Sequence, residues 1–502
     1  MANQPYVIPV NTNGAVESSH RTGVGSDSTT NQVKVDGADG QVTFLSRVMG
    51  ELETVAHNEN HNDLYYFKQS RDLKTCAQPH VAQLRTWLYD EVRVFCESVT
   101  DMILNPGRLN LFSARYPPTG RLLCHDDQLE GRKIAFIIYL SPADWSSGKD
   151  EGGTLGVYDS VIGVDGKLEP TPNPMHKLPP TWNTLSFFEV SERSFHQVEE
   201  VIGNRTRYSV GGWFHELPQA DRVKTSPSAI ATKSTTDIAD KVSSSQLAAD
   251  QINITGDTIR STTDIADKVS SSQLAADQIN ITDDTIRRAV ERPGSESEQC
   301  LEDWINEVYL RKPIQANIQD KFADDSSIQL KDFLVPIKFK ELDEALTGNG
   351  MAWHTDITPL KAKYATLCGG RPSGVIHDVQ SLLSSKAFLE LVNTLSGLDT
   401  TSVTTRIRKF AHGDYTMLPH GDTHKDCECL EVSLAVCRTQ WKESWGGIRT
   451  YLVEGEEVIS IAPEANTLSI VFRSADTDRF VRYITHTADD ASYVDIEAIC
   501  TE

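Results

Sequence analysis

Apolar residues recur at helical spacing in two stretches near the beginning of the chain. The first stretch contains Phe44, Val48, Leu52 and Val55, and the second contains Val81, Leu84, Trp87, Leu88 and Val92. Residues three and four positions apart lie on one face of an α-helix, so both stretches are predicted to be amphipathic helices. We expect these helices to pack on the outside of a sheet.

The pattern changes between Leu109 and Phe214, where short apolar runs are separated by Gly, Pro, Asn and Asp. These runs are 134–140, 153–158, 182–190 and 208–214. After Cys300 the chain has a helix predicted at Trp304, Val308 and Leu310, followed by strand-like runs at 430–437, 458–461 and 468–472. Closely spaced short strands favour an antiparallel sandwich or barrel. The predicted fold is therefore mainly β with flanking helices (α+β), in two related sheet domains.

Composition sets the predicted domain boundaries. Residues 1–40 are polar without a period and are expected to be disordered, and folded domains are predicted at 41–217 and 299–502. Residues 218–298 are rich in Ser, Thr, Asp and Ala and contain a 27-residue tandem repeat, 234–260 and 261–287. Because about three repeats are needed to bury a shared core, we interpret this segment as a linker, with a docking helix as the alternative.

The charge balance bears on partners and location. A formal net charge of -23 argues against nucleic acid or an anionic membrane as a direct partner and favours a basic partner. The N-terminus lacks the features of a signal peptide, and no apolar run approaches the ~20 residues of a membrane span. We therefore expect a soluble intracellular protein.

Candidate metal ligands occur as a His-x-Asp tripeptide, His125 and Asp127, with His196 further along the chain. On a strand, the two tripeptide ligands would project from one face, because side chains alternate with period two. Two His and one carboxylate form the facial triad of non-haem Fe(II) oxygenases, which leaves positions for a bidentate 2-oxoacid and dioxygen. The alternative interpretation is that these His residues are hydrogen-bonded polar residues of a sheet.

The residues after the tripeptide distinguish it from the five other His-x-Asp pairs in the chain. Only His125 and Asp127 are followed by an apolar strand, then a second His after another strand, then an Arg that opens a third strand. The sequence therefore selects His125, Asp127 and His196 as catalytic residues and metal ligands.

The Arg that opens the third strand is Arg207, whose guanidinium can clamp the distal carboxylate of 2-oxoglutarate bidentately. Arg205 has the same strand parity, but Arg207 directly precedes the apolar run 208–214. Ser209 would share the face of Arg207, where it could add a hydroxyl to the cosubstrate site or serve as a small core residue.

Several motifs together carry a resemblance to a known family. The stretches are NDLYYFKQSRDLK (62–74), CHDDQLEGRKIAFIIYL (124–140), GGTLGVYDS (152–160), FFEVSERSFHQVEEV (187–201), RYSVGGWFHE (207–216), RKFAHGDYTMLPH (408–420) and GGIRTYLVEGEE (446–457). In this order they resemble the ribosomal prolyl hydroxylase family. That family includes fungal prolyl 3,4-dihydroxylases involved in translation termination and a fission-yeast oxygen-sensing regulator of a sterol-responsive transcription factor.

The resemblance implies a fold and a site. The fold is two double-stranded β-helix (jelly-roll) domains, of which the N-terminal one is catalytic and the C-terminal one is not. The implied iron ligands are His125, Asp127 and His196, and 2-oxoglutarate is implied to bind Arg207 and Tyr116. Fe(II), 2-oxoglutarate and O2 are the expected cofactors, with L-ascorbate as a reductant.

The resemblance also implies a substrate, a proline of a small-subunit ribosomal protein, and an effect on translation termination. The expected location is nucleus and cytoplasm. Two alternatives remain open: oxygenation of another substrate, or an oxygen-sensing regulatory protein whose C-terminal domain binds a transcription-factor degradation partner.

The second half contains an imitation of the first triad, in which His420 and Asp422 are followed by His486. The positions ten and eleven residues beyond His486 are Ile496 and Glu497, and an acid there would repel 2-oxoglutarate. This half is therefore interpreted as non-catalytic.

Overall fold

A computed structural model describes ten stretches of the chain. They are residues 6–9, 43–129, 131–146, 150–163, 166–218, 301–348, 351–355, 358–367, 373–418 and 427–502. Contacts divide the chain into two compact units, Met1–Ser160 with Pro174–Ala275, and Val161–Asn173 with Ala276–Glu502. The predicted linker and its repeat lie outside the described residues.

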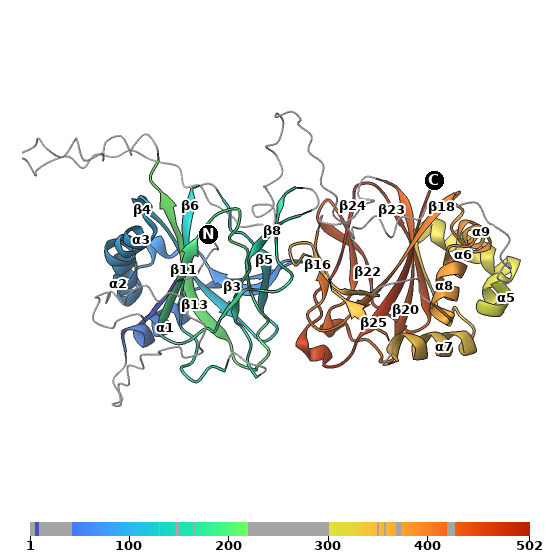
Figure 1. Ribbon diagram of the computed structural model, residues 1–502, viewed down its shortest axis with the longest axis horizontal. Coiled ribbons are helices and arrows are strands. Elements are labelled where there is room, and N and C mark those ends of the chain that lie inside the picture. Colours follow the sequence, from blue (N-terminus) through green and yellow to red (C-terminus); the bar gives the residue numbers. More distant parts are fainter. Residues whose placement is uncertain are drawn as a thin grey trace, which may run out of the picture. The chain divides into compact units, whose positions relative to one another are not determined.

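The first unit is an eleven-stranded antiparallel sheet that curls into two layers, with helices over one layer (Figure 1). The strands are β1 (Tyr6–Pro9), β2 (His57–His61), β3 (Tyr65–Ser70), β4 (Leu104–Tyr116), β5 (Arg121–His125), β6 (Arg132–Tyr139), β7 (Leu155–Val157), β10 (His176–Leu178), β11 (Thr184–Glu189), β12 (His196–Val198) and β13 (Arg207–Glu216). Their order is β1-β11-β6-β13-β4-β3-β5-β12-β7-β10, with β2 paired to β3. The layers β11-β6-β13-β4 and β5-β12-β7-β10 form the double-stranded β-helix.

Three helices cover the layer that contains β4, β6, β11 and β13. They are α1 (Phe44–Glu53), α2 (Pro79–Trp87) and α3 (Arg93–Thr100). The Thr43 side chain caps α1 by accepting a hydrogen bond from the Ser46 amide, and Val48 and Leu52 bury the apolar face of that helix. These side chains join Ile138, Phe187 and other strand residues in one core. The two predicted amphipathic helices are confirmed, although the second continues after α2 through a π-helical turn, Leu88–Val92.

Strand β1 corrects the expectation that residues 1–40 have no regular structure. Tyr6–Pro9 pairs antiparallel with β11, with Val7 opposite Ser186. A run of four residues is too short to show strand periodicity, so its β-branched residues gave no signal against the polar sequence around it. The backbone of these four residues extends one edge of the first sheet.

The second unit repeats the same strand topology. Its strands are β14 (Ser327–Leu330), β15 (Trp353–His354), β16 (Ala362–Lys363), β17 (Ala365–Leu367), β18 (Ser402–Phe410), β19 (Tyr415–Thr416), β20 (Cys429–Cys437), β21 (Arg449–Val453), β22 (Glu456–Ile461), β23 (Thr467–Arg473), β24 (Thr477–Val481) and β25 (Tyr493–Thr501). The order β23-β20-β25-β18 matches β11-β6-β13-β4, and β22-β21-β24 matches β10-β7-β12. The prediction of two related sheet domains with flanking helices is confirmed.

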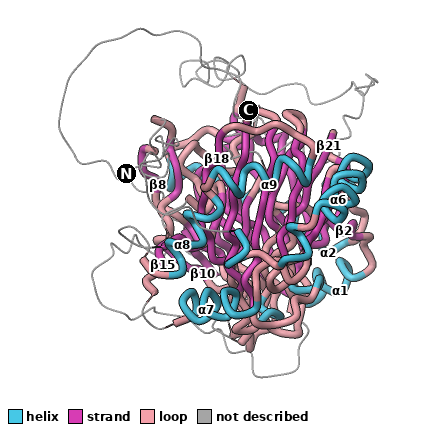
Figure 2. Tube along the Cα trace, turned by 90° about the vertical axis from the view of Figure 1, so that its right-hand side faces the viewer, coloured by secondary structure: helices cyan, strands magenta, loops and turns pink. Residues whose placement is uncertain are grey.

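Helices cover one face of the large sheet in this unit (Figure 2). They are α5 (Leu301–Trp304), α6 (Lys312–Asp325), α7 (Pro336–Thr347), α8 (Val375–Leu383) and α9 (Lys386–Ser396). The single helix predicted through Trp304 and Leu310 is wrong, because α5 ends at Trp304 and a 3-10 helix, Glu307–Leu310, begins after Asn306. Among the helices that the structure describes, none has the length and apolar character needed to cross a membrane.

Candidate active site

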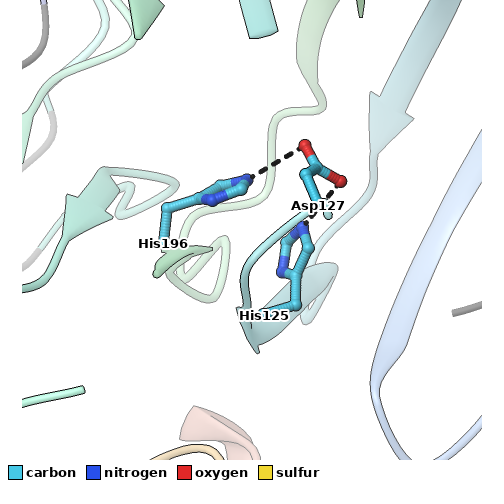
Figure 3. A group of neighbouring side chains, drawn as sticks. All are labelled: His125, Asp127 and His196. Atoms are coloured by element: carbon cyan, nitrogen blue, oxygen red, sulfur yellow. Dashed lines mark ion pairs between the residues drawn. The ribbon is translucent and has the colours of Figure 1, made fainter. Parts of the chain in front are cut away.

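Side chains from two separate parts of the chain, His125 with Asp127 and His196, converge inside the first unit (Figure 3). His125 ends β5 and pairs directly with His196, the first residue of β12. Nε2 of His125 lies 3.6 Å from Oδ1 of Asp127, and Nε2 of His196 lies 3.5 Å from Oδ2. The potential ligand atoms all lie within 4.8 Å of one another, and no other group of this kind occurs among the described residues.

Asp127 reaches this cluster by a route that strand alternation does not predict. Strand β5 ends at His125, and Asp127 lies two residues beyond it with a φ of +60°. The expectation that both ligands project from one strand face is therefore wrong for Asp127. Asp is one of the few residues that adopt this left-handed conformation readily, because its short side chain can form local hydrogen bonds.

Backbone hydrogen bonds orient both imidazoles. Nδ1 of His125 lies 2.8 Å from the Leu123 carbonyl, and Nδ1 of His196 lies 2.7 Å from the Ser194 carbonyl. A carbonyl only accepts, so each Nδ1 carries the proton and each Nε2 presents a lone pair to the cluster. Burial, together with the neighbouring His196, lowers the pKa of His125 to about 4, which keeps this imidazole neutral.

The Asp127 carboxylate is held as an anion by its surroundings. Burial alone would raise its pKa, but the adjoining His196 and His125 side chains and the Arg132 guanidinium outweigh burial and hold that pKa well below the usual range. The Trp213 indole N–H also donates to Oδ2 at 2.9 Å. A carboxylate beside two imidazoles is the donor set that a divalent iron site requires.

Arg207 is the first residue of β13, opposite Tyr116 of β4. Its side chain is 1% exposed, and its Nε donates to the Gly153 carbonyl at 2.8 Å. The guanidinium carbon lies 4.9 Å from the centre of the Tyr116 ring, and Nη1 lies 3.4 Å from the Ser209 hydroxyl. The structure thus brings together the three residues proposed from the sequence for the cosubstrate.

Arg205, the competing arginine, lies elsewhere. It forms ion pairs with Asp144 and Glu151, and its side chain is 35% exposed. Its charge is already compensated by two carboxylates, whereas no carboxylate of the described residues pairs with Arg207.

Among the described residues, three buried polar atoms around Arg207 make no hydrogen bond of standard geometry, although the Tyr139 hydroxyl lies close enough to Ser186 and Arg207 for both to lower its pKa. They are Nη2 of Arg207, the Tyr139 hydroxyl and the Ser186 hydroxyl. Tyr139 lies directly opposite Ser209 in the sheet, and the Arg207 guanidinium carbon is 5.2 Å from its ring centre. Buried polar groups are almost always hydrogen-bonded, so this group fits an incoming carboxylate such as that of 2-oxoglutarate.

Sequence reasoning missed Tyr139 and Ser186 as well as Arg132 and Trp213, the two neighbours of Asp127. Tyr139 and Ser186 lie within apolar strands, where they are indistinguishable from core residues. The available sequence signal concerned Trp213: it is an even number of residues from Arg207 on the same strand, so both side chains are expected on one face of the sheet.

The second unit has different residues at the corresponding positions. In the first unit, His196 lies opposite Val157, which is four residues after Gly153. In the second unit, Arg479 lies opposite Tyr451, which is four residues after Gly447. Arg479 therefore corresponds to His196. His486 belongs instead to a 3-10 helix, His486–Ala488, after β24, while His420 and Asp422 lie outside the described residues.

The Arg207 position is also changed in the second unit. Tyr493 opens β25, and its hydroxyl donates to the Gly447 carbonyl at 2.9 Å, as Arg207 does to Gly153 in the first unit. Arg479 bridges Glu431 and Glu497 through Nη1, at 2.7 and 2.6 Å. A cation therefore stands at the position that carries a metal-ligand candidate in the first unit.

Comparison with known proteins places the chain in a family. A model described as the 2OG-Fe(II) oxygenase superfamily matches residues 111–215, and one described as "Oxoglutarate and iron-dependent oxygenase degradation C-term" matches residues 296–499. Prolyl 3-hydroxylase OGFOD1 of Xenopus laevis is 31% identical over 482 residues, which covers 88% of this chain and 81% of that protein. The Mus musculus protein of the same name is 29% identical over 89% of this chain and 83% of its own length. Prolyl 3,4-dihydroxylase OGFOD1 of Ostreococcus tauri is 26% identical over 90% of this chain and 91% of its own length.

The fold, the triad and the superfamily match define a 2-oxoglutarate- and Fe(II)-dependent oxygenase. Within this class the chain belongs to the OGFOD1 family of prolyl hydroxylases. The resemblance noted in the sequence is confirmed.

Proposed function

We propose that His125, Asp127 and His196 hold Fe(II), and that Arg207 binds the distal carboxylate of 2-oxoglutarate. The observation that carries this proposal is a buried guanidinium with an unpartnered Nη2 in the same barrel as the triad. Tyr116, Tyr139, Ser186 and Ser209 complete the carboxylate site. When bound, Fe(II) and 2-oxoglutarate supply oxidation of a C–H bond by dioxygen, with release of succinate and carbon dioxide.

The protein residues have separate tasks in this proposal. The two imidazoles offer Nε2 to the metal, because each Nδ1 donates its proton to a backbone carbonyl. Arg207 and its neighbours orient the cosubstrate from the opposite end. Leu155 and Val157 of β7, both almost completely buried, help to exclude water from the barrel. L-ascorbate is the expected reductant.

The proposed substrate is a proline of a small-subunit ribosomal protein, hydroxylated once or twice. The named relatives are a prolyl 3-hydroxylase and a prolyl 3,4-dihydroxylase, which supports proline as the target. The net charge of -23 is complementary to a basic ribosomal protein. Action on the ribosome accords with the expected location in nucleus and cytoplasm and with a role in translation termination.

Mass spectrometry of the substrate tests this function. The purified chain is incubated with Fe(II), 2-oxoglutarate and small-subunit ribosomal proteins, and a His125→Ala variant serves as the control. We expect one or two added oxygen atoms on a proline, and none with the variant. Succinate formation that depends on another protein and leaves ribosomal prolines unmodified would refute the substrate, while absence of succinate with every substrate would refute the active site.

A second candidate function, binding of a degradation partner by the second unit, is favoured by one observation. The family model that matches residues 296–499 has degradation in its description, and Arg479 replaces a metal ligand in this non-catalytic unit. Co-precipitation of a transcription factor by the full chain tests it. Equal capture by wild type and His125→Ala would support binding independent of iron, and no capture by either would refute it.

A further inference from the structure

We propose that Trp213 and Arg132 are positioning residues that fix the Asp127 carboxylate for metal binding. This inference rests on the proposed function, because it concerns the same iron site. Neither residue is a ligand candidate. Both act through Asp127, the one member of the triad that no strand holds in place.

Asp127 needs such support because of its backbone. His125 and His196 lie in paired strands, where the ladder fixes their Cα positions. Asp127 lies in the following turn with a φ of +60°. It is not among the residues that pair between β5 and β12. A carboxylate on a turn can rotate about χ1 and χ2, so a defined orientation requires hydrogen bonds from other elements.

Trp213 provides the first of these hydrogen bonds from β13. Residues two apart on a strand share a face, so Trp213 points to the same side as Arg207 and Ser209. Its Nε1 donates to Oδ2 of Asp127 at 2.9 Å. The indole nitrogen can only donate a hydrogen bond, so this contact singles out one carboxylate oxygen as its acceptor and restricts rotation of the carboxylate.

Arg132 opens β6 and lies against both Trp213 and Asp127. Its guanidinium carbon is 3.5 Å from the centre of the Trp213 ring, and its Nη1 is 3.4 Å from Oδ1 of Asp127. Phe112 packs against the same indole in a T-shaped arrangement, with ring centres 5.7 Å apart. The indole is therefore held between two side chains, and each oxygen of Asp127 has its own donor.

Each of the two donors contacts a different oxygen of the Asp127 carboxylate. Oδ1 faces His125 and Arg132, while Oδ2 faces His196 and Trp213. Partners of metal ligands typically change metal affinity by 10–100-fold when removed. We therefore expect their loss to weaken metal binding and leave the distant cosubstrate carboxylate site unchanged.

Metal titration of Trp213→Phe tests the proposal, since this change keeps an aromatic ring and removes the N–H. Mn(II) binding is followed by electron paramagnetic resonance in the full chain. Trp87→Phe is the matched control. Trp87 ends α2, away from the strands that carry the triad, and its Nε1 has no hydrogen-bond partner among the described residues. We expect Trp213→Phe to raise the Mn(II) dissociation constant roughly 10–100-fold, and Trp87→Phe to change it less than about twofold.

Kinetics provide the second readout. At saturating metal, Trp213→Phe should keep the KM for 2-oxoglutarate, whereas the Fe(II) concentration needed for half-maximal turnover should rise in parallel with the Mn(II) constant. Arg132→Met should act in the same direction, and Arg132→Lys should restore part of the affinity. The Arg132 pair also keeps the test decisive if Trp213→Phe fails to fold.

The outcomes separate this inference from the proposed function. Wild-type Mn(II) affinity in Trp213→Phe and Arg132→Met would overturn the positioning role and leave the iron site intact. A higher KM for 2-oxoglutarate with unchanged metal affinity would also overturn it. A wild-type chain that binds no Mn(II) and forms no succinate would overturn the proposed function and this inference together.

Discussion

Replacement of Arg207 by lysine tests the cosubstrate site most sharply, because it keeps the charge and removes the planar fork of donors. Arg207 is 1% exposed and uses Nε on the Gly153 carbonyl, which leaves Nη1 and Nη2 for a carboxylate. A lysine ammonium cannot reproduce both contacts. A hydrogen bond to a charged group contributes about 1.5–3 kcal/mol, so losing one should raise the KM for 2-oxoglutarate roughly 10- to 150-fold.

The assay measures succinate formation against 2-oxoglutarate concentration. The increase should appear in KM, with kcat changed much less, because the triad is intact and the lost contact is present in ground and transition states alike. Arg205→Lys is the matched control, since its side chain is 35% exposed and paired with Asp144 and Glu151. An unchanged KM in Arg207→Lys, or an equal increase in Arg205→Lys, would refute the assignment.

Three further predictions concern other buried polar groups. Tyr139→Phe should raise the KM for 2-oxoglutarate roughly tenfold with little change in the Tm of the unliganded chain, because its hydroxyl makes no hydrogen bond of standard geometry among the described residues; an unchanged KM would exclude it from the site. Arg479→Met should destabilise the second unit by about 1.5–3 kcal/mol in urea unfolding, since Glu431 and Glu497 each lose one charged donor and keep their other arginine partners, and a loss below about 1 kcal/mol would contradict that role. Burial raises the pKa of Asp414 to about 6 from 3.8, so its stabilising contribution is complete below pH 4 and is lost as the pH rises through 6. Asp414→Asn should therefore gain up to about 3 kcal/mol over wild type between pH 4 and pH 8, and a gain independent of pH in thermal unfolding would contradict this.

The sequence predicted the site where chemistry and strand order coincide. His125 and His196 were identified because an apolar strand, a second His after another strand and an Arg follow the tripeptide in this order, and Arg207 because it opens the third strand. Their convergence required only that β5, β12 and β13 belong to one curled sheet, which the spacing of the runs already indicated.

Other parts of the site depend on information that strand patterns lack. The turn at Asp127 depends on the left-handed conformation of that one residue. The alternation of side chains along a strand predicts an extended backbone there instead. Tyr139 and Ser186 are recognisable only by their missing partners, a property of the folded interior. Arg132 and Trp213 meet Asp127 across three elements, and no local pattern encodes that contact.

The same limit applies to the second unit. Sequence spacing aligned His486 with His196, whereas strand register places Arg479 at that position. The error arose because the 3-10 helix His486–Ala488 follows β24 and carries a His a few residues beyond the strand. The non-catalytic interpretation was reached by placing Glu497 at the Arg207 position, and this placement is wrong, because strand register puts Tyr493 there. Glu497 lies in the buried cluster with Arg406, Arg408 and Arg479.

Isotope tracing tests the central claim that this chain couples 2-oxoglutarate oxidation to hydroxylation at His125, Asp127 and His196. The purified chain is incubated under 18O2 with Fe(II), 2-oxoglutarate and small-subunit ribosomal proteins, and succinate and peptides are analysed by mass spectrometry. We predict one 18O atom in succinate and 18O on proline, both absent from His125→Ala. Succinate that remains unlabelled, or labelling that persists in His125→Ala, would contradict the account.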